Sequence, residues 1–342
     1  MRPRRGMAAG ALVLLLGVGG CYKRNKSSVI AVIPRDTAEE IWVSEHGGAA
    51  DAAARHGLTV YWNGPSREDE VEQQIALVDR AIKKRVYGII LSPNDTFALT
   101  MTVQRAISHE VPMVILGSRV PVLPGPRLAY VLNDVQAGGW MAAQRVSHLL
   151  HGKGKVVLLG VDPTSPGSVE QADAFEQALG KIAPGITVAE KLIGAFSFGQ
   201  SEEAMEKALY AHNDVSAVFA LGTNATRGAY AAARIMGRAD KVAILGCDQT
   251  LDLMFLVRNG SIDSLLAQDM RAMGDMAVEM LVAVTKGQAV PPYTYYRPML
   301  VTKDNIDTEP VQRLLDMNWH PDPARKPENR GFTKPFHQGE PM

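Results

Sequence analysis

The chain has 342 residues, which at roughly 100–200 residues per domain predicts two domains, each with its own core. Hydrophobic residues make up 46% and charged residues 21%, as is usual for a soluble globular protein. The 36 basic residues balance the 36 acidic ones and form no cluster in the body of the chain, which argues against nucleic acid as a partner.

The beginning of the chain has the parts of a secretory signal peptide. Residues 1–5 are positively charged, and residues 8–20 form an apolar run that is too short for a stable membrane span. This segment ends in Leu-Gly-Val-Gly-Gly-Cys at residues 16–21, which resembles a bacterial lipobox and implies cleavage before Cys21 and a lipid on its thiol. The alternative is an ordinary signal peptide that is cut elsewhere. We expect residues 1–20 to be removed, residues 21–28 to form a polar tether, and the protein to be exported as a membrane-anchored lipoprotein of the periplasm or outer cell-envelope face.

Apolar runs and amphipathic segments alternate from residue 28 onward. Short apolar runs that end at a turn predict buried strands, and apolar residues at helical spacing predict helices. The first series predicts strands at residues 28–34, 58–62, 87–92 and 112–116, and helices at residues 42–56, 70–84 and 97–109. The second series predicts helices at residues 135–150, 168–182, 200–211, 225–236, 251–259 and 270–286, and strands at residues 155–159, 187–193, 217–221, 242–246 and 264–268.

Repeated strand–helix units predict parallel sheets with right-handed crossovers, and therefore an α/β protein in which one type of domain is used twice. Residues 319–342 depart from this pattern, because they are rich in proline and charge. We expect this tail to be disordered.

Asp248 stands out because it follows directly on the buried run at residues 242–246. In open α/β sheets, ligands bind beyond the carboxyl ends of the strands, so this carboxylate is a candidate ligand-binding group. The alternative is that Asp248 caps the helix that begins near Leu251.

Several stretches in this order resemble the periplasmic sugar-binding proteins of the ribose/galactose-binding type, which are type I periplasmic binding proteins. Residues 243–248 resemble the family's strand that ends in a ligand-binding acid. Residues 257–262, followed by Leu-Ala-Gln at residues 266–268, resemble the next strand segment. Residues 274–287 resemble the helix that returns to the first domain. Repressors that share this body carry a DNA-binding helix-turn-helix where this chain has a signal peptide.

The resemblance spans residues 28–302 and implies two Rossmann-like lobes with parallel sheets, joined by a hinge of three segments. The boundaries expected from it are residues 29–133 plus 269–292 for the N-terminal lobe and residues 134–268 plus 293–318 for the C-terminal lobe. Ligand is expected in the cleft between the lobes.

The resemblance also implies roles for individual residues. It assigns hydroxyl binding to Asp248 and Gln268, bidentate hydrogen bonding to Arg119, and stacking on a sugar ring to Trp42 and Phe196. Each has a simpler alternative: Gln268 could form hydrogen bonds within the hinge, Arg119 could form a surface ion pair, and Trp42 could pack in the core. Phe196 has core packing as its alternative too.

Further candidates are Asn133 and Asp134 at the first crossing, and Asn224 beside a strand end. The chain also departs from the family pattern: Glu39 and Glu40 replace an asparagine near the first aromatic residue, and Glu170 stands near an expected arginine. The scaffold therefore matches the family better than the pocket does.

The implied function is that of a solute-binding subunit of an ABC importer, which binds a sugar or sugar-like polyol and delivers it to a permease. A monomer is expected. The alternative is a sensor that reports ligand to a membrane receptor or histidine kinase. No enzyme, cofactor or metal is expected, because the sequence lacks a G-x-S-x-G elbow, a P-loop and clustered histidines.

Overall fold

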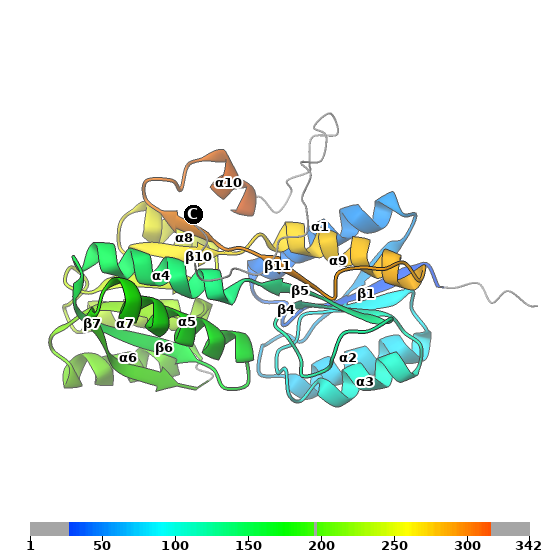
Figure 1. Ribbon diagram of the computed structural model, residues 1–342, viewed down its shortest axis with the longest axis horizontal. Helices are drawn as coiled ribbons and strands as arrows, with labels where there is room; N and C mark the ends of the chain where they lie inside the picture. Colours follow the sequence, from blue (N-terminus) through cyan, green and yellow to red (C-terminus); the bar gives the residue numbers. More distant parts are fainter. Residues whose placement is uncertain (1–26, 195–196, 316–342) are drawn as a thin grey trace, which may run out of the picture.

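The computed structural model describes residues 27–194 and 197–315, and these form two α/β lobes side by side (Figure 1). Within these residues there are two six-stranded sheets, with the orders β11-β5-β4-β3-β1-β2 and β12-β10-β9-β8-β6-β7. The pairing is parallel throughout the first sheet, and in the second only β10 and β12 are antiparallel. This arrangement confirms the predicted fold class.

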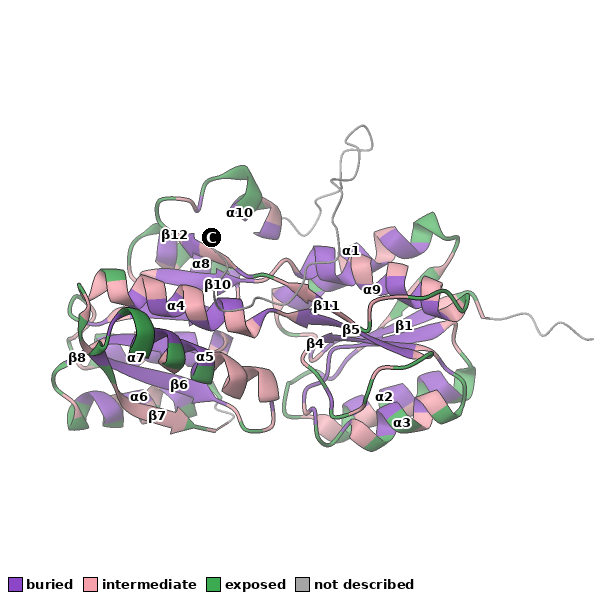
Figure 2. Ribbon diagram, in the orientation of Figure 1, coloured by how far each residue is buried: buried purple, intermediate pink, exposed green. Residues whose placement is uncertain are grey.

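The first lobe contains the strands β1 (Val29–Ile33), β2 (Thr59–Trp62), β3 (Gly88–Leu91), β4 (Met113–Gly117), β5 (Leu128–Asn133) and β11 (Tyr293–Tyr296). Its helices are α1 (Glu40–Arg55), α2 (Val71–Lys84), α3 (Thr100–Ser108) and α9 (Met270–Thr285). One apolar cluster joins the sheet to α1 and α9, and another joins its other face to α2 and α3. The sheet is therefore buried on both faces, as Figure 2 shows, which explains why its strands are continuous apolar runs.

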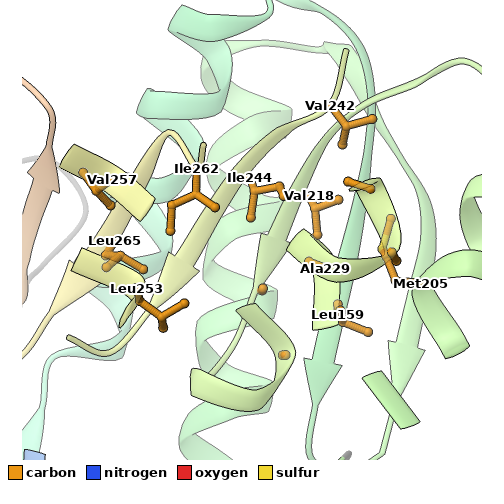
Figure 3. Packing of buried hydrophobic residues seen from close by; sticks show 14 of the residues in the cluster. Leu159, Met205, Val218, Ala229, Val242, Ile244, Leu253, Val257, Ile262 and Leu265 are labelled. Carbon is orange, nitrogen blue, oxygen red and sulfur yellow. The ribbon is translucent and has the colours of Figure 1, made fainter. Parts of the chain in front are cut away.

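The second lobe contains the strands β6 (Lys153–Val161), β7 (Gly185–Ile193), β8 (Val215–Ala220), β9 (Ala243–Cys247), β10 (Ser264–Ala267) and β12 (Met299–Thr302). Its helices are α4 (Val135–Leu149), α5 (Pro166–Ile182), α6 (Phe198–Ala211), α7 (Thr223–Ile235), α8 (Leu251–Arg258) and α10 (Glu309–Leu315). Figure 3 shows the core of this lobe, in which Ala229 of α7 and Leu253 of α8 pack against Val218 and Ile244 of the sheet.

Helices α1 and α9 pack closely against each other because glycine, which has no side chain, stands at two positions of their contact. A Cβ atom at Gly48 would lie 1.9 Å from the carbonyl oxygen of Arg271, and one at Gly274 would lie 2.3 Å from that of Glu45. Both distances are far inside van der Waals contact, so only glycine permits this packing.

The described chain passes between the lobes three times, after β5, β10 and β11. The last crossing differs from the expected boundary between residues 292 and 293. Tyr293–Tyr296 pairs with β5 in the first sheet, so the chain crosses after Tyr296. The reason is that Tyr293 packs on Tyr130 of the first lobe, with ring centroids 5.2 Å apart. None of the helices in the described ranges is long and apolar enough to span a membrane.

Candidate functional site

The two lobes touch through the loops at the carboxyl ends of their strands. Thr96, after β3, donates from its backbone nitrogen and from its hydroxyl to the carbonyl oxygen of Thr164, after β6, at 3.3 and 2.8 Å. The backbone nitrogen of Leu251, at the start of α8, donates to Oε2 of Glu40 from the first lobe at 3.1 Å. Because a carboxylate at a helix N-terminus is stabilising, Glu40 acts as a cap supplied from the opposite lobe. These contacts join the two lobes.

Two ion pairs also cross between the lobes. Nη1 of Arg227 in α7 lies 3.0 Å from Oε1 of Glu39, and Nη2 of Arg119 lies 3.2 Å from Oε1 of Glu170 in α5. Arg227 also binds Asp252 through two nitrogens, at 2.8 and 3.0 Å. Burial raises the pKa of Glu39, against the opposing charge of Arg227. Glu39, Glu40 and Glu170, which depart from the family pattern, therefore each bind a residue of the opposite lobe.

Asp248 lies at the end of β9 and faces this junction. Its φ of 69° is left-handed, a conformation in which Asp is more frequent than most residues, and its Oδ2 accepts a hydrogen bond from the hydroxyl of Thr223 at 3.2 Å. Burial raises the pKa of Asp248 to about 6, while the Thr223 hydroxyl and the positive charge of Arg35 act in the opposite direction. The residue at the N-cap of α8 is Thr250, so the capping alternative for Asp248 does not describe this structure.

Arg35, which follows β1, brings a positive charge from the first lobe toward Asp248. Its Nε lies 2.6 Å from Oε1 of Glu68, and its Nη2 donates to the carbonyl oxygen of Asn94 at 3.5 Å. Arg35 is not among the residues predicted from the sequence, although it lies directly after a predicted strand, as Asp248 does.

Three amide side chains at strand ends have buried polar atoms without a hydrogen-bond partner in the described part of the chain. These are Nδ2 and Oδ1 of Asn94 after β3, Oδ1 of Asn133 at the end of β5, and Oε1 of Gln268 after β10. A buried polar atom without a partner costs about 1–3 kcal/mol, so such atoms are rare unless a bound group satisfies them. Asn94 is a candidate that the sequence analysis missed. Asn133 and Gln268 are predicted candidates, and each has a buried amide oxygen without a partner among the described residues.

Other predicted residues lie in less accessible or already occupied positions. Trp42 is only 8% exposed within the first-lobe core, and its Nε1 donates to Oδ2 of Asp36 at 3.0 Å, which favours the packing alternative over stacking. Asp134 caps α4 by accepting from the backbone nitrogen of Ala137 at 3.0 Å. Arg119 forms the ion pair described above. Asn224 is half-buried in the first turn of α7.

The remaining predicted positions cannot be placed. Phe196, Cys21, the signal peptide and the tail from residue 319 lie outside the described residues.

Comparison with known proteins decides the family. A family model described as a periplasmic binding protein domain matches residues 30–289. The chain belongs to this family. The match confirms the resemblance found in the sequence.

The relatives of this periplasmic binding protein include sugar-binding proteins. It is 28% identical to the "Putative rhizopine-binding protein" of Rhizobium meliloti, over 70% of this chain and 78% of that protein. It is 26% identical to the ribose import binding protein of Escherichia coli strain K12, over 76% of this chain and 86% of that protein.

Solved structures show the same fold. An ABC transporter solute-binding protein from Agrobacterium vitis, bound with alpha-D-tagatopyranose, superposes with a TM-score of 0.78 at 23% identity, covering 84% of this chain and 98% of that one. One from Actinobacillus succinogenes, with bound D-allose, superposes with a TM-score of 0.73 at 24% identity, covering 81% of this chain and 98% of that one.

Proposed function

We propose that this protein is the solute-binding subunit of an ABC importer and binds a sugar or sugar-like polyol between its lobes. The observation that carries the proposal is the position of Asp248: a partly buried acid at the end of β9, within reach of the charge of Arg35 from the first lobe, with one hydroxyl as its hydrogen-bond partner. Relatives named for ribose and rhizopine support the ligand class.

The available groups suit a polyhydroxylated ligand. A carboxylate accepts hydrogen bonds from several hydroxyls, and charge-assisted bonds of this kind are about twice as strong as neutral ones. The amides of Asn94, Asn133 and Gln268 both donate and accept, as hydroxyl groups do. Because these residues come from both lobes, a ligand reaches all of them only in the closed form and therefore stabilises that form.

Calorimetric titration of a sugar panel tests the proposal. The panel comprises ribose, allose, arabinose, tagatose and fucose, together with neutral cyclitols and unrelated metabolites such as amino acids. Micromolar or tighter binding of a sugar or cyclitol is expected. Tight binding of an amino acid, with no binding anywhere in the carbohydrate panel, would contradict it.

We propose further that the protein is exported and held at the membrane by a lipid on Cys21, with residues 22–28 as the tether, and that it acts as a monomer. Metabolic labelling with palmitate is expected to mark the wild type and to fail with Cys21→Ser. Light scattering on the signal-less protein is expected to give the mass of one chain. A labelled Cys21→Ser variant would refute the anchor, and a dimer mass would refute the monomer.

A further inference from the structure

The outer face of the second lobe carries a hollow between α7 and α8, here called the α7–α8 groove. It has a volume of about 630 Å³, and its lining includes Phe198, Arg227, Tyr230, Arg234, Ile235 and Leu256. The residues from α7 are three or four positions apart, so they lie on one face of that helix. The opposite face of α7 and that of α8 pack on the sheet through Ala229 and Leu253 (Figure 3). The groove is therefore a surface feature and not part of the core.

Large apolar side chains are exposed in and beside the groove. Ile235 is 63% exposed and Phe198 is 45% exposed. On α8, Leu251 and Phe255 are 54% and 62% exposed, each next in sequence to a residue that lines the groove. Exposed apolar side chains gathered around a hollow on a soluble protein are typical of an interaction site.

The charged side chains in the groove indicate the charge that a binding partner would carry. The Arg234 guanidinium lies over the ring of Tyr230, 5.7 Å from its centroid, and no carboxylate among the described residues lies within ion-pair distance of it. The second arginine, Arg227, is bound by Asp252 and by Glu39. A carboxylate on an otherwise apolar partner segment would complement Arg234.

Arg227 connects the groove to closure of the lobes. It lines the groove, and the same guanidinium binds Glu39 of the first lobe at 3.0 Å. When the lobes separate, Glu39 leaves and this wall of the groove loses one of its anchors. The lining residues all belong to the second lobe, and two nitrogens of Arg227 stay bound to Asp252, so the groove persists when the lobes separate.

We infer that the α7–α8 groove docks an apolar, carboxylate-bearing segment of the importer's membrane-spanning subunit. This inference rests on the proposed function, because docking presupposes an importer. It adds the surface used and the chemistry of the partner segment.

The test measures ATPase stimulation of the importer from the same organism, reconstituted in proteoliposomes, by the sugar-loaded protein. Ile235→Glu places a charge in the groove and is expected to raise the concentration for half-maximal stimulation at least about tenfold, as for a central interface residue. Arg234→Glu is expected to act in the same direction. Tyr210→Glu is the matched control, because Tyr210 is an 84% exposed aromatic residue of α6 that does not line the groove. This variant is expected to change the concentration for half-maximal stimulation less than about twofold.

Sugar binding is measured on the same variants by calorimetry and is expected to stay unchanged. Normal sugar binding combined with equal stimulation by Ile235→Glu and Tyr210→Glu would overturn the docking inference alone. Absence of sugar binding in the wild type would instead overturn the proposed function. A wild-type dimer that Ile235→Glu converts to a monomer would assign the groove to a second copy. Increased labelling of Ile235→Cys after removal of residues 319–342 would assign it to the tail. Either result would also overturn the inference.

Discussion

Each lobe has an acidic side chain near the carboxyl end of a strand, Glu45 of α1 beside Ser92 after β3 and Asp248 after β9, and the two acids differ in depth. Glu45 in the first lobe is fully buried, and the hydroxyl of Ser92 donates to its Oε2 at 2.9 Å. Asp248 in the second lobe is only half-buried and accepts from the hydroxyl of Thr223 at 3.2 Å. Burial raises the pKa of Glu45 to about 8 and that of Asp248 to about 6.

The depth of burial decides which of the two acids can bind a ligand. At neutral pH Glu45 is mostly protonated and is enclosed by its own lobe, so it contributes to packing. Asp248 is ionised at that pH, has Arg35 of the opposite lobe nearby, and lies where both lobes meet. A carboxylate of this kind binds hydroxyl groups strongly.

The largest expected effect is on ligand affinity. Asp248→Asn keeps the shape of the side chain and removes its charge, so the affinity for the sugar is expected to fall about 100-fold, or about 2.7 kcal/mol. Glu45→Gln is expected to change affinity less than about threefold, since Glu45 is uncharged in the folded protein near pH 7. Calorimetry measures both, with Asp214→Asn, an exposed aspartate of the same lobe, as the control. Equal losses from Asp248→Asn and Glu45→Gln would break the distinction between the two acids.

The second prediction concerns stability of the first lobe against pH. The folded pKa of Glu45, about 8, lies above the ordinary value of 4.5. Folding therefore favours the protonated Glu45 side chain. The stability that this side chain contributes to the folded protein is fully present below pH 4.5 and is lost as the pH rises toward 8. The slope that Glu45 adds approaches at most about 1.4 kcal/mol per pH unit.

Glu45→Gln is expected to remove that slope from the free energy of unfolding, measured by urea denaturation from pH 5 to pH 8. Glu72→Gln, at an exposed position of α2, should leave the slope as it is in the wild type. A wild-type stability that does not depend on pH in this range would contradict the assignment of Glu45.

The third prediction concerns affinity against pH and follows from Asp248. Hydroxyl donors favour its ionised form, so the affinity is expected to rise as pH increases toward about 6 and to level off above it. Arg35, Glu39 and Glu68 also act on this carboxylate, and burial remains the largest cause of its raised pKa. Titrations at pH 5, 6 and 7 should show the rise in the wild type and lose it in Asp248→Asn. A rise that persists in the variant would place the titrating group elsewhere.

The smallest expected effect separates the two ion pairs between the lobes. The side chains of Arg227 and Glu39 are 28% and 23% exposed, whereas those of Arg119 and Glu170 are 49% and 45% exposed. Exposed pairs contribute less, so Glu39→Gln is expected to disfavour the closed form by about 1 kcal/mol and Glu170→Gln by less than about 0.5 kcal/mol. Energy transfer between dyes on the two lobes of the sugar-free protein measures the shift. A larger opening with Glu170→Gln would reverse this order.

The sequence predicts the elements that carry strong local patterns. Strand–helix alternation gave the α/β class, and the position of Asp248 after an apolar run placed it at a strand end. The strands β5, β11 and β12 were not predicted. β5 follows a proline-rich stretch, and β11 depends on aromatic packing between Tyr293 and Tyr130, which lie far apart in the chain.

Side-chain partners were harder to predict than elements. For Arg119 the sequence leaves open ligand binding or a surface ion pair, and Glu170, 51 positions away, is its partner across the lobes. For Trp42 the sequence leaves open ring stacking or core packing, and Asp36 binds its ring nitrogen inside the core. Asn94 was missed because nothing in the local sequence shows that its amide is buried without a partner. Such contacts depend on how the two lobes meet, and hydrophobic periodicity carries no information on that.

A crystal structure with the highest-affinity sugar of the panel tests the central claim most directly. The account predicts a sugar between the lobes, with a hydroxyl within about 2.6–3.2 Å of the Asp248 carboxylate and the Asn94 amide in contact with the same molecule. A sugar bound away from the junction, or one that contacts neither Asp248 nor Asn94, would contradict it.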